Sequence, residues 1–318
     1  MSVIGIPKAL SYHKYGTLWR IFFEELGEEV VFSSDSDRGL LEKGIGACVT
    51  EACLPLKTWF GHALDVAPRA DWLFAPRYMS VFRREYICPK FGGLPDMARP
   101  VLRGVRLLSP QVNRHDRDDG ALQGALDAAR DLGHGSAVAR RAYQRATAAY
   151  LAERWAQVRL PKNNRSSPVV LLMGHSYMLG DGFLSMDVAG KLRRLGATVR
   201  RMESFDAREL RLAAAGLEKP LFWTYGTQAL GCVELARRCV DGVLYVTCFG
   251  CGVDSFVAWM AERRLRDAGV PFALLSLDEH TAQAGVDTRL EAFVDTLAGR
   301  MGNTDRCNAA DGGWGDAR

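Results

Sequence analysis

The sequence predicts an α/β protein of two doubly wound, flavodoxin- or Rossmann-like parallel-sheet domains that face each other across a cleft. Short apolar runs alternate with amphipathic segments of helical period along the chain, and this alternation is typical of parallel sheets with right-handed crossovers. It restarts after the polar stretch 161–168, which carries two prolines and indicates a domain boundary. We therefore expect an N-terminal domain at 1–162, a C-terminal domain at 163–300 and a disordered tail at 301–318.

The first half is expected to open with a short strand and to continue through alternating elements, with one long irregular loop. Long loops inside compact domains are often functional. In order, the predicted elements are a strand at 3–6, a helix through 18–26, a strand at 29–32, a helix at 37–43 capped by Asp37, a helix at 54–66, a strand at 71–75, the irregular loop 76–96 and two helices within 120–159.

The second half repeats the pattern with four strands. Each strand is followed by a helical segment, as expected of a second parallel sheet. The predicted elements are a strand at 169–173, a loop and helix reaching 195, a strand at 197–201, helices at 207–215 and 228–240, a strand at 242–246, a helix at 254–266, a strand at 271–275 and a helix at 287–300.

Composition predicts an ordinary soluble protein. The chain has 318 residues, 48% hydrophobic and 25% charged, with a net charge of +4, which gives no indication of nucleic-acid binding. No apolar run approaches the roughly 20 residues that span a bilayer, and the first residues do not resemble a signal peptide. We therefore expect a cytoplasmic protein without a membrane partner. Structural disulfides are rare in the cytoplasm. We therefore expect metal binding or simple packing to explain the eight cysteines.

Three separated cysteine segments carry the clearest chemical signal. They are Glu51-Ala-Cys53-Leu-Pro55, Ile87-Cys88-Pro-Lys90 and Cys248-Phe-Gly-Cys251-Gly252. Each lies beside glycine or proline after an apolar stretch, which predicts thiols in loops. Ligands of open parallel sheets bind beyond the carboxyl ends of the strands, so we expect Cys53, Cys88 and Cys251 to reach one cleft. Thiolates gathered from distant loops are typical of soft-metal and iron–sulfur sites.

Packing is the alternative for the other cysteines, because a cysteine outside a disulfide often behaves as a small buried hydrophobe. Cys232 and Cys239 share one face of a predicted helix and are expected in the core. Cys48 is expected to be buried rather than to bind a metal. Cys307 lies in the predicted tail and is given no role.

The Cys248-x-x-Cys251 pair leaves other chemistry open. A strand, two cysteines separated by two residues and then a helix is also the arrangement of thiol–disulfide oxidoreductases. That alternative would leave Cys53 and Cys88 unexplained. A zinc site is a further alternative, which would need four ligands.

Several motifs together resemble a known family. They include Glu51-Ala-Cys-Leu-Pro-Leu-Lys57, Cys88-Pro-Lys-Phe-Gly-Gly-Leu-Pro-Asp96 and, in the second half, Gly174-His-Ser-Tyr-Met-Leu-Gly-Asp181 and Phe249-Gly-Cys-Gly-Val-Asp-Ser-Phe256. In this order they are similar to the 2-hydroxyacyl-CoA dehydratase-related family, and more narrowly to the domain often fused to acyl-CoA dehydratase activases. The resemblance spans about residues 3 to 300.

The resemblance implies an oxygen-sensitive, anaerobe-type iron–sulfur protein with a 4Fe–4S or double-cubane cluster. Cys53, Cys88 and Cys251 match the family's cysteine positions, and Cys248 is kept only as a fourth ligand to consider. The family also implies an ATP-hydrolysing activase partner, with a homodimer or a second dehydratase-like subunit. This chain carries no recognisable nucleotide-binding motif, so the activase is expected to be a separate protein. Whether the chain is a lyase, a reductase component or a non-catalytic cluster carrier or scaffold stays open.

Two further groups are candidates for supporting roles. Glu279 and His280 follow the strand predicted at 271–275, and His280 is a candidate proton donor or acceptor, with a loop-bridging structural cluster as the alternative. His175 and Tyr177 are weaker candidates for a substrate pocket. Four basic residues flank Cys88 and are candidates to offset a cluster's negative charge, to form a solvated face or to dock the activase; these are Arg77, Arg83, Arg84 and Lys90.

Overall fold

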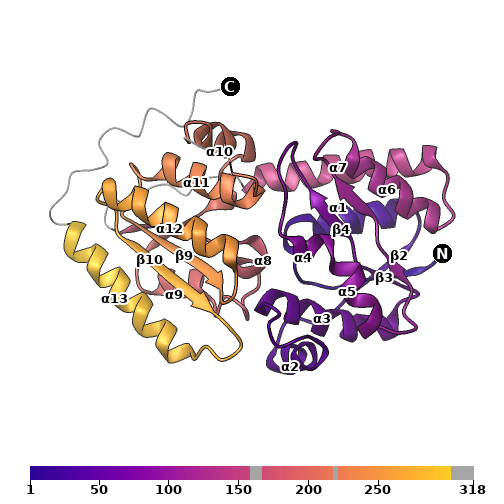
Figure 1. The fold of residues 1–318 in the computed structure, drawn as a ribbon, viewed down its shortest axis with the longest axis horizontal. Helices are drawn as coiled ribbons and strands as arrows, with labels where there is room; N and C mark the ends of the chain where they lie inside the picture. The colour runs from indigo at the N-terminus through magenta and orange to yellow at the C-terminus, as the bar shows by residue number, and fades with distance from the viewer. Residues whose placement is uncertain (158–166, 218–220, 302–318) are drawn as a thin grey trace. The chain divides into compact units, whose positions relative to one another are not determined.

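The computed structural model describes residues 1–157, 167–217 and 221–301 (Figure 1). Its contacts divide the chain into two compact units: Met1–Gln157 with Leu221–Tyr225, and Val158–Pro220 with Gly226–Arg318. The boundary predicted between residues 162 and 163 lies outside the described residues. So does the predicted tail beyond Met301, where the last helix ends.

Each unit contains a four-stranded sheet in which every strand pair is parallel, as the sequence predicted. The orders are β2-β1-β3-β5 and β10-β9-β7-β8. When the strands of each sheet are counted in chain order, both sheets read 2-1-3-4, the start of a flavodoxin-like order. The strands are β1 (Val3–Ile6), β2 (Glu29–Phe32), β3 (Trp72–Phe74), β5 (Leu107–Leu108), β7 (Val169–Met173), β8 (Thr198–Arg201), β9 (Gly242–Cys248) and β10 (Phe272–Leu277).

Helices cover both faces of the first sheet because its central strand alternates its residues between them. Ile4 and Ile6 join a core with Trp19 of α1. Gly5 faces the other way, where an added Cβ would lie 3.2 Å from Val66 at the end of α3. The helices of this unit are α1 (Tyr12–Glu25), α2 (Arg38–Ala47), α3 (Leu54–Val66), α4 (Pro89–Gly92), α5 (Leu94–Val101), α6 (Gly120–Asp131) and α7 (Ser136–Gln157), with a 3₁₀ turn at Ala67–Arg69.

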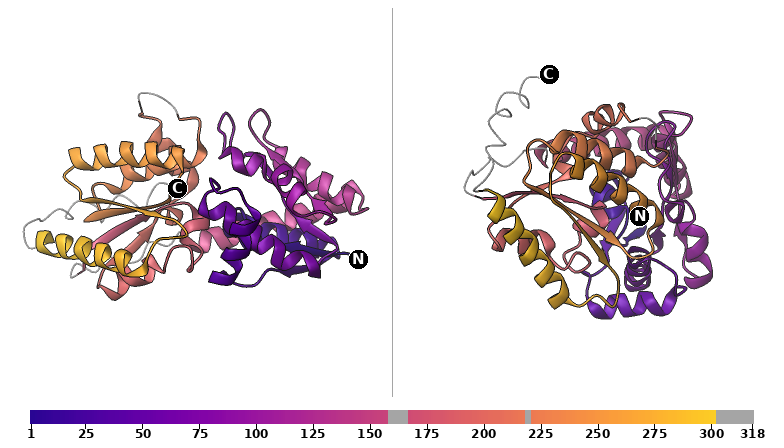
Figure 2. Two further views of the ribbon diagram at one scale, coloured as in Figure 1. Left: turned by 60° about the horizontal axis from the view of Figure 1, so that its bottom comes forward. Right: turned by 60° about the vertical axis from the view of Figure 1, so that its left-hand side comes forward.

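The second sheet is covered in the same way. Gly242 of β9 packs against α13, where an added Cβ would lie 2.8 Å from Leu297 and 2.9 Å from Phe293. The left view of Figure 2 shows α12 in orange and α13 in yellow on opposite faces of this sheet. The helices are α8 (Ser176–Leu179), α9 (Val188–Arg194), α10 (Ala207–Ala214), α11 (Thr224–Ala236), α12 (Gly252–Asp267) and α13 (Gln283–Met301), with a 3₁₀ turn at Met202–Ser204.

The stretch 76–96 is not the long irregular loop that the sequence predicted. Its first part is strand β4 (Arg77–Ser80), which pairs in parallel with β6 (Gln111–Asn113). Tyr78 and Ser80 are buried while Met79 is exposed, so this strand does alternate, but over too few residues to be recognised. Pro89 and Pro95 stand in the first turns of α4 and α5, where proline is tolerated well. Residues 81–88 between them are irregular apart from an isolated bridge at Tyr86.

Helices α2 and α3 pack backbone against backbone. A Cβ added to Gly44 would lie 1.8 Å from the carbonyl oxygen of Lys57, and one added to Gly61 would lie 2.1 Å from that of Leu40. Both distances are far inside van der Waals contact, so this approach requires glycine on both helices. Because α3 leads into the amino end of β3, its own N-terminus lies toward the carboxyl ends of the strands. The packing therefore fixes the position of Cys53, the residue that precedes α3.

We predict that Gly44→Ala destabilises the protein by about 1–3 kcal/mol, because the new methyl group forces α2 away from α3. Gly46→Ala in the same helix is the matched control: nothing lies within 4 Å of its added Cβ. That change should instead stabilise by up to about 1 kcal/mol, through helix propensity. Urea unfolding followed by circular dichroism measures both, and equal midpoints for the two variants would contradict the close-packing argument.

Candidate functional site

The three cysteines predicted as ligands share one local position, immediately before a helix. Cys53 is the N-cap of α3, Cys88 of α4 and Cys251 of α12. All three are half-buried, and none caps its helix through a side-chain hydrogen bond. Helices prefer Ser, Thr, Asp or Asn at this position. At three helix starts, a thiol therefore stands where a capping side chain would stabilise the helix. This indicates that the three cysteines serve a purpose other than helix stability.

The remaining described cysteines occupy different surroundings. Cys232 and Cys239 are buried, which confirms the predicted core assignment, and burial raises the pKa of Cys232 well above its usual value. Cys48 is the C-cap of α2 and is half-buried, and desolvation raises the pKa of its thiol to about 12. Cys248 ends β9 and is 5% exposed. None of the seven cysteines in the described residues belongs to a disulfide.

The segment that leads to Cys88 is fixed at several points. Arg77 donates to the carbonyl of Gly92 and forms a 2.7 Å ion pair with Asp96. At residue 86 the chain pairs with the segment 221–225: the amide of Tyr86 donates to the carbonyl of Phe222 at 2.6 Å, and the amide of Thr224 donates back to Tyr86 at 2.9 Å. Cys88 therefore comes two residues after a position whose backbone is held by hydrogen bonds to the segment 221–225.

In the second unit, a buried carboxylate organises the carboxyl ends of β7 and β9. Asp254, in the first turn of α12, is fully buried. It accepts hydrogen bonds from the Thr247 hydroxyl at 2.8 Å, the Tyr245 hydroxyl at 3.3 Å and Nε2 of His175 at 3.1 Å. A buried charge is tolerated only when it is paired and hydrogen-bonded, and three donors meet that requirement. We call these four residues the Asp254 network.

The Asp254 network lies where the strand order reverses, between the first strand of the unit and its third. This switch point is the usual ligand site of open α/β sheets. His175 follows Gly174 directly after β7, and its ring stacks on Tyr177 with centroids 4.7 Å apart. The sequence singled out His175 and Tyr177 but missed Asp254. Its partner His175 is 79 positions away, and no local pattern indicates that pairing.

The pKa values of Asp254 and Cys251 are both lower than usual. Burial by itself would raise the pKa of Asp254, but the charge and hydrogen bond of His175 and the two hydroxyl donors lower it below the usual carboxyl value. A hydrogen bond from Cys248 is the main reason why the pKa of Cys251 falls to about 7; burial and the Asp254 carboxylate oppose this, while the Asp254 amide and His175 assist it. The thiolate form of Cys251 is therefore favoured relative to that of an ordinary cysteine.

Glu279 and His280 lie in a tight turn after β10. The backbone amide of His280 and the hydroxyl of Thr281 both donate to the Asp278 carboxylate, at 3.0 and 2.8 Å. The His280 side chain is 84% exposed, and its Nε2 lies 4.0 Å from the Glu279 carboxylate. Asp278 therefore caps this turn, and proton transfer by His280 stays a prediction.

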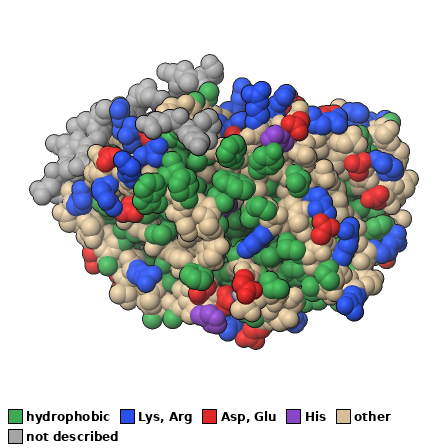
Figure 3. Space-filling view, in the orientation of Figure 1, with side chains coloured by type: hydrophobic (Ala, Val, Ile, Leu, Met, Phe, Trp, Pro, Cys, Tyr) green, Lys and Arg blue, Asp and Glu red, His purple; other side chains and the backbone are tan. Residues whose placement is uncertain are grey.

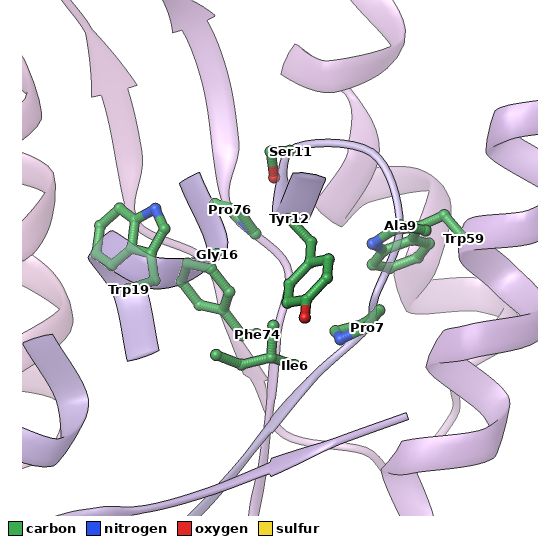
Figure 4. A pocket seen from close by; sticks show the side chains of 10 residues that line it. All are labelled: Ile6, Pro7, Ala9, Ser11, Tyr12, Gly16, Trp19, Trp59, Phe74 and Pro76. Atoms are coloured by element: carbon green, nitrogen blue, oxygen red, sulfur yellow. The ribbon is translucent and has the colours of Figure 1, made fainter. Parts of the chain in front are cut away.

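The corresponding switch point of the first unit is filled rather than open. A hollow of about 10 Å³ lies between the ends of β1 and β3 (Figure 4), which is room for roughly one water molecule. The ring of Tyr12 occupies much of the space between Pro7 and Phe74 in this view. A substrate would not fit there. The lining residues are Ile6, Pro7, Ala9, Ser11, Tyr12, Gly16, Trp19, Trp59, Phe74 and Pro76.

Cys53 and Cys88 belong to the first unit, and Cys251 belongs to the second. Within the described residues no group of three or more His, Cys, Asp or Glu side chains is arranged to hold a metal ion. The structure therefore establishes the local setting of each cysteine, and the shared cluster remains a prediction.

We predict that Cys251 is the most reactive thiol of the second unit in metal-free protein. Its iodoacetamide alkylation rate, followed by mass spectrometry, should rise through a midpoint near pH 7. Cys248→Ala removes the hydrogen bond that contributes most to the low pKa, so it should move the midpoint upward and slow alkylation at pH 7. Cys48 serves as the internal control and should stay unreactive there. An unchanged midpoint in Cys248→Ala would contradict the assigned cause.

Among the helices of the described ranges, none combines the length and apolar character needed to cross a lipid bilayer.

Comparison with solved structures gives only weak similarity. The SBP FpvC of Pseudomonas aeruginosa, solved with Ni²⁺, is 13% identical, with 94% of this chain and 96% of that chain covered and a TM-score of 0.25. The laminin-binding protein Lbp of Streptococcus pyogenes is 10% identical, with 95% and 98% covered and a TM-score of 0.27. Similarity at this level carries no argument about what the chain binds. No curated protein matches the chain.

A family model does match. The CoA enzyme activase uncharacterised domain covers residues 3–205, more than half of the 318 residues. This match agrees with the motifs around Cys53, Cys88 and the Gly174 loop. It confirms the resemblance found in the sequence, and the chain belongs to this CoA enzyme activase-associated family.

Proposed function

We propose that the chain is an iron–sulfur protein whose cluster, of the 4Fe–4S or double-cubane type, is held by Cys53, Cys88 and Cys251. In this proposal it acts in ATP-coupled low-potential electron transfer with a separate activase, as a component resembling the 2-hydroxyacyl-CoA dehydratases. The observation that carries the proposal is the shared position of the three thiols, each directly before a helix and half-buried.

The chemistry of the three cysteines fits such a group. Cys53 and Cys251 precede helices of 13 and 16 residues, whose N-termini carry partial positive charge and favour the thiolate form that binds metal. When bound, a cysteine-ligated cluster supplies one-electron chemistry at low potential. The chain's own residues set its surroundings: partial burial limits water, the Asp254 network fixes the start of α12, and Arg77 fixes the loop of Cys88. His280 would exchange protons with solvent, with Glu279 beside it.

An apolar surface beside Cys251 supports the proposed partner. Phe249, Phe256 and Trp259 are 71, 53 and 55% exposed, and the last two rings stack with centroids 6.1 Å apart. Figure 3 shows hydrophobic side chains on the same face as α11 and α12. Large exposed aromatic side chains grouped around one site are typical of protein–protein contacts. We assign this surface to the activase.

A thiol–disulfide oxidoreductase is the second candidate, favoured by one observation. Cys248 donates a hydrogen bond to Cys251, whose pKa is about 7, as in a reactive dithiol. The more exposed Cys251 would attack, and the buried Cys248 would resolve the mixed disulfide. This candidate uses two cysteines of the second unit and gives no role to Cys53 or Cys88.

Iron and acid-labile sulfide should be measured in protein purified without oxygen. We predict about four iron per cubane and a broad brown absorbance. Cys88→Ser should abolish both, whereas a dithiol enzyme would keep full activity with that change. Cys48→Ser is the control and should leave iron content unchanged. Colourless wild-type protein that also resists anaerobic reconstitution would contradict the cluster proposal, and the dithiol would then be the leading site. A colourless protein with bound zinc would favour a zinc site.

Cys53→Ser should separate function from stability. Serine is a preferred N-cap, so the metal-free variant should be more stable than the wild type by about 1 kcal/mol, while losing its iron. Urea unfolding of the metal-free proteins, together with iron analysis, tests both effects. A destabilised variant would show that the thiol is retained for packing, which is the opposite of what the proposal requires.

A further inference from the structure

The first unit includes a short segment from the second half of the chain. Residues 221–225 belong to the first unit, whereas the described residues on either side of them, up to 217 and from 226 onward, belong to the second. Ordering a segment costs conformational entropy, and a connection that stayed within the second unit would not order these residues against the first. We therefore expect the segment 221–225 to serve a purpose in the first unit.

The segment pairs with the backbone of Tyr86. Trp223 forms an isolated parallel bridge with this residue. In the bridge, the amide of Tyr86 donates to the carbonyl of Phe222 at 2.6 Å, and the amide of Thr224 donates to the carbonyl of Tyr86 at 2.9 Å. Both backbone polar groups of Tyr86 are thereby satisfied, as they are in a strand. We call this pairing the Tyr86 clamp, and Cys88 lies two residues beyond it.

The loop before Cys88 contains a residue in an unfavourable conformation. Arg84 has a φ of 58°, in the left-handed region that residues other than glycine seldom adopt, so surrounding contacts must fix it. Its amide donates to the carbonyl of His115 at 3.1 Å, and the His115 ring stacks on that of Tyr86 with centroids 4.4 Å apart. The residues that follow β6 therefore hold one side of the loop, and the Tyr86 clamp holds it from the segment 221–225.

Strand β4 holds the chain on both sides of Cys88. The amide of Ile87 donates to the carbonyl of Met79 at 3.3 Å, and Arg77 donates to the carbonyl of Gly92. These contacts join residues that are close in sequence, whereas the clamp joins residue 86 to residues 222 and 224. A ligand must be held within about 0.5 Å of its productive position, and backbone contacts on both sides of the thiol are suited to that purpose.

We propose that the Tyr86 clamp is a positioning element for Cys88: by pairing with Tyr86, the segment 221–225 fixes the backbone that presents this thiol to the cluster. The purpose of the clamp rests on the proposed iron–sulfur function, but the clamp itself can be tested in metal-free protein. Helix α11 begins at Thr224, so one pair of hydrogen bonds holds both the start of this helix and the loop of Cys88.

Two substitutions of Thr224 separate the backbone hydrogen bond from the side chain. Thr224→Pro removes the amide that donates to Tyr86, and the ring carbon that replaces the amide hydrogen pushes the Tyr86 carbonyl away. Proline otherwise suits the first residue of α11 and the extended conformation of Trp223 before it. Thr224→Val is the matched control. It keeps the amide and removes a buried hydroxyl that has no hydrogen-bond partner within the part of the chain that the structure describes.

In metal-free protein, Thr224→Pro should speed hydrogen exchange at the Tyr86 amide. It should also speed iodoacetamide alkylation of the half-buried Cys88 several-fold, because the released loop opens to solvent. Alkylation of Cys53, in the same unit, reports general destabilisation and should stay unchanged, and Thr224→Val should match the wild type throughout. Equal Cys88 rates in the two variants, or equal changes at Cys53 and Cys88, would overturn the positioning role.

A measurement on the wild type decides the matter even where Thr224→Pro does not fold. The amides of Tyr86 and Thr224 should exchange slowly and with equal protection, because one local opening breaks both hydrogen bonds. Fast exchange at both amides would overturn the clamp.

Reconstituted protein tests the link to the cluster. After anaerobic reconstitution, Thr224→Pro should lose iron to a chelator several-fold faster than Thr224→Val, and equal rates of loss would overturn the role of the clamp in positioning a cluster ligand. Wild-type protein that takes up no iron would contradict the proposed function alone. The exchange and alkylation rates of the metal-free proteins would still decide whether the clamp holds Cys88.

Discussion

The direction of parallel strands is the constraint on which the rest of this structure depends. Every crossover must return the chain to the amino ends of the strands, so helices that lead into the next strand begin on the carboxyl side. α3 leads into β3 and α12 leads into β10, and a cysteine precedes each. The same constraint brings His175, which follows β7, next to Asp254, which follows β9. The chemistry of both units is therefore concentrated on one edge of each sheet.

Each unit places a buried charge within about one turn of a helix-starting cysteine, but the two charges differ in sign. Lys57 follows Cys53, and Asp254 follows Cys251. Asp254 is stabilised locally by hydroxyl and imidazole donors, and these bonds fix the start of α12 and the ring of His175. Lys57 donates to the carbonyl of Thr50, which ties the start of α3 to the loop that carries Cys53. The two cysteines therefore lie in different electrostatic surroundings.

Periodicity predicted most of the fold because each sheet is built from local strand–helix units. The helix Leu54–Val66 has its predicted bounds, and Asp37 caps α2 by accepting from the amide of Leu40. Prediction failed at β4, which depends on pairing with β6, more than thirty positions later. It also missed the His175–Asp254 pair and the burial of Lys57, because both arise only when separate segments pack together. Helix α12, its starting residue Cys251 and the cysteines before α3 and α4 were all visible in the sequence.

Local energetics favour the cluster over the dithiol as the explanation of this chain. A helix start without a capping side chain costs about 0.5–2 kcal/mol, and here that cost recurs at Cys53, Cys88 and Cys251. Marginally stable proteins retain such costs where function requires them. A dithiol at Cys248 and Cys251 would account for one of the three positions. A cluster ligated by all three would account for every one of them.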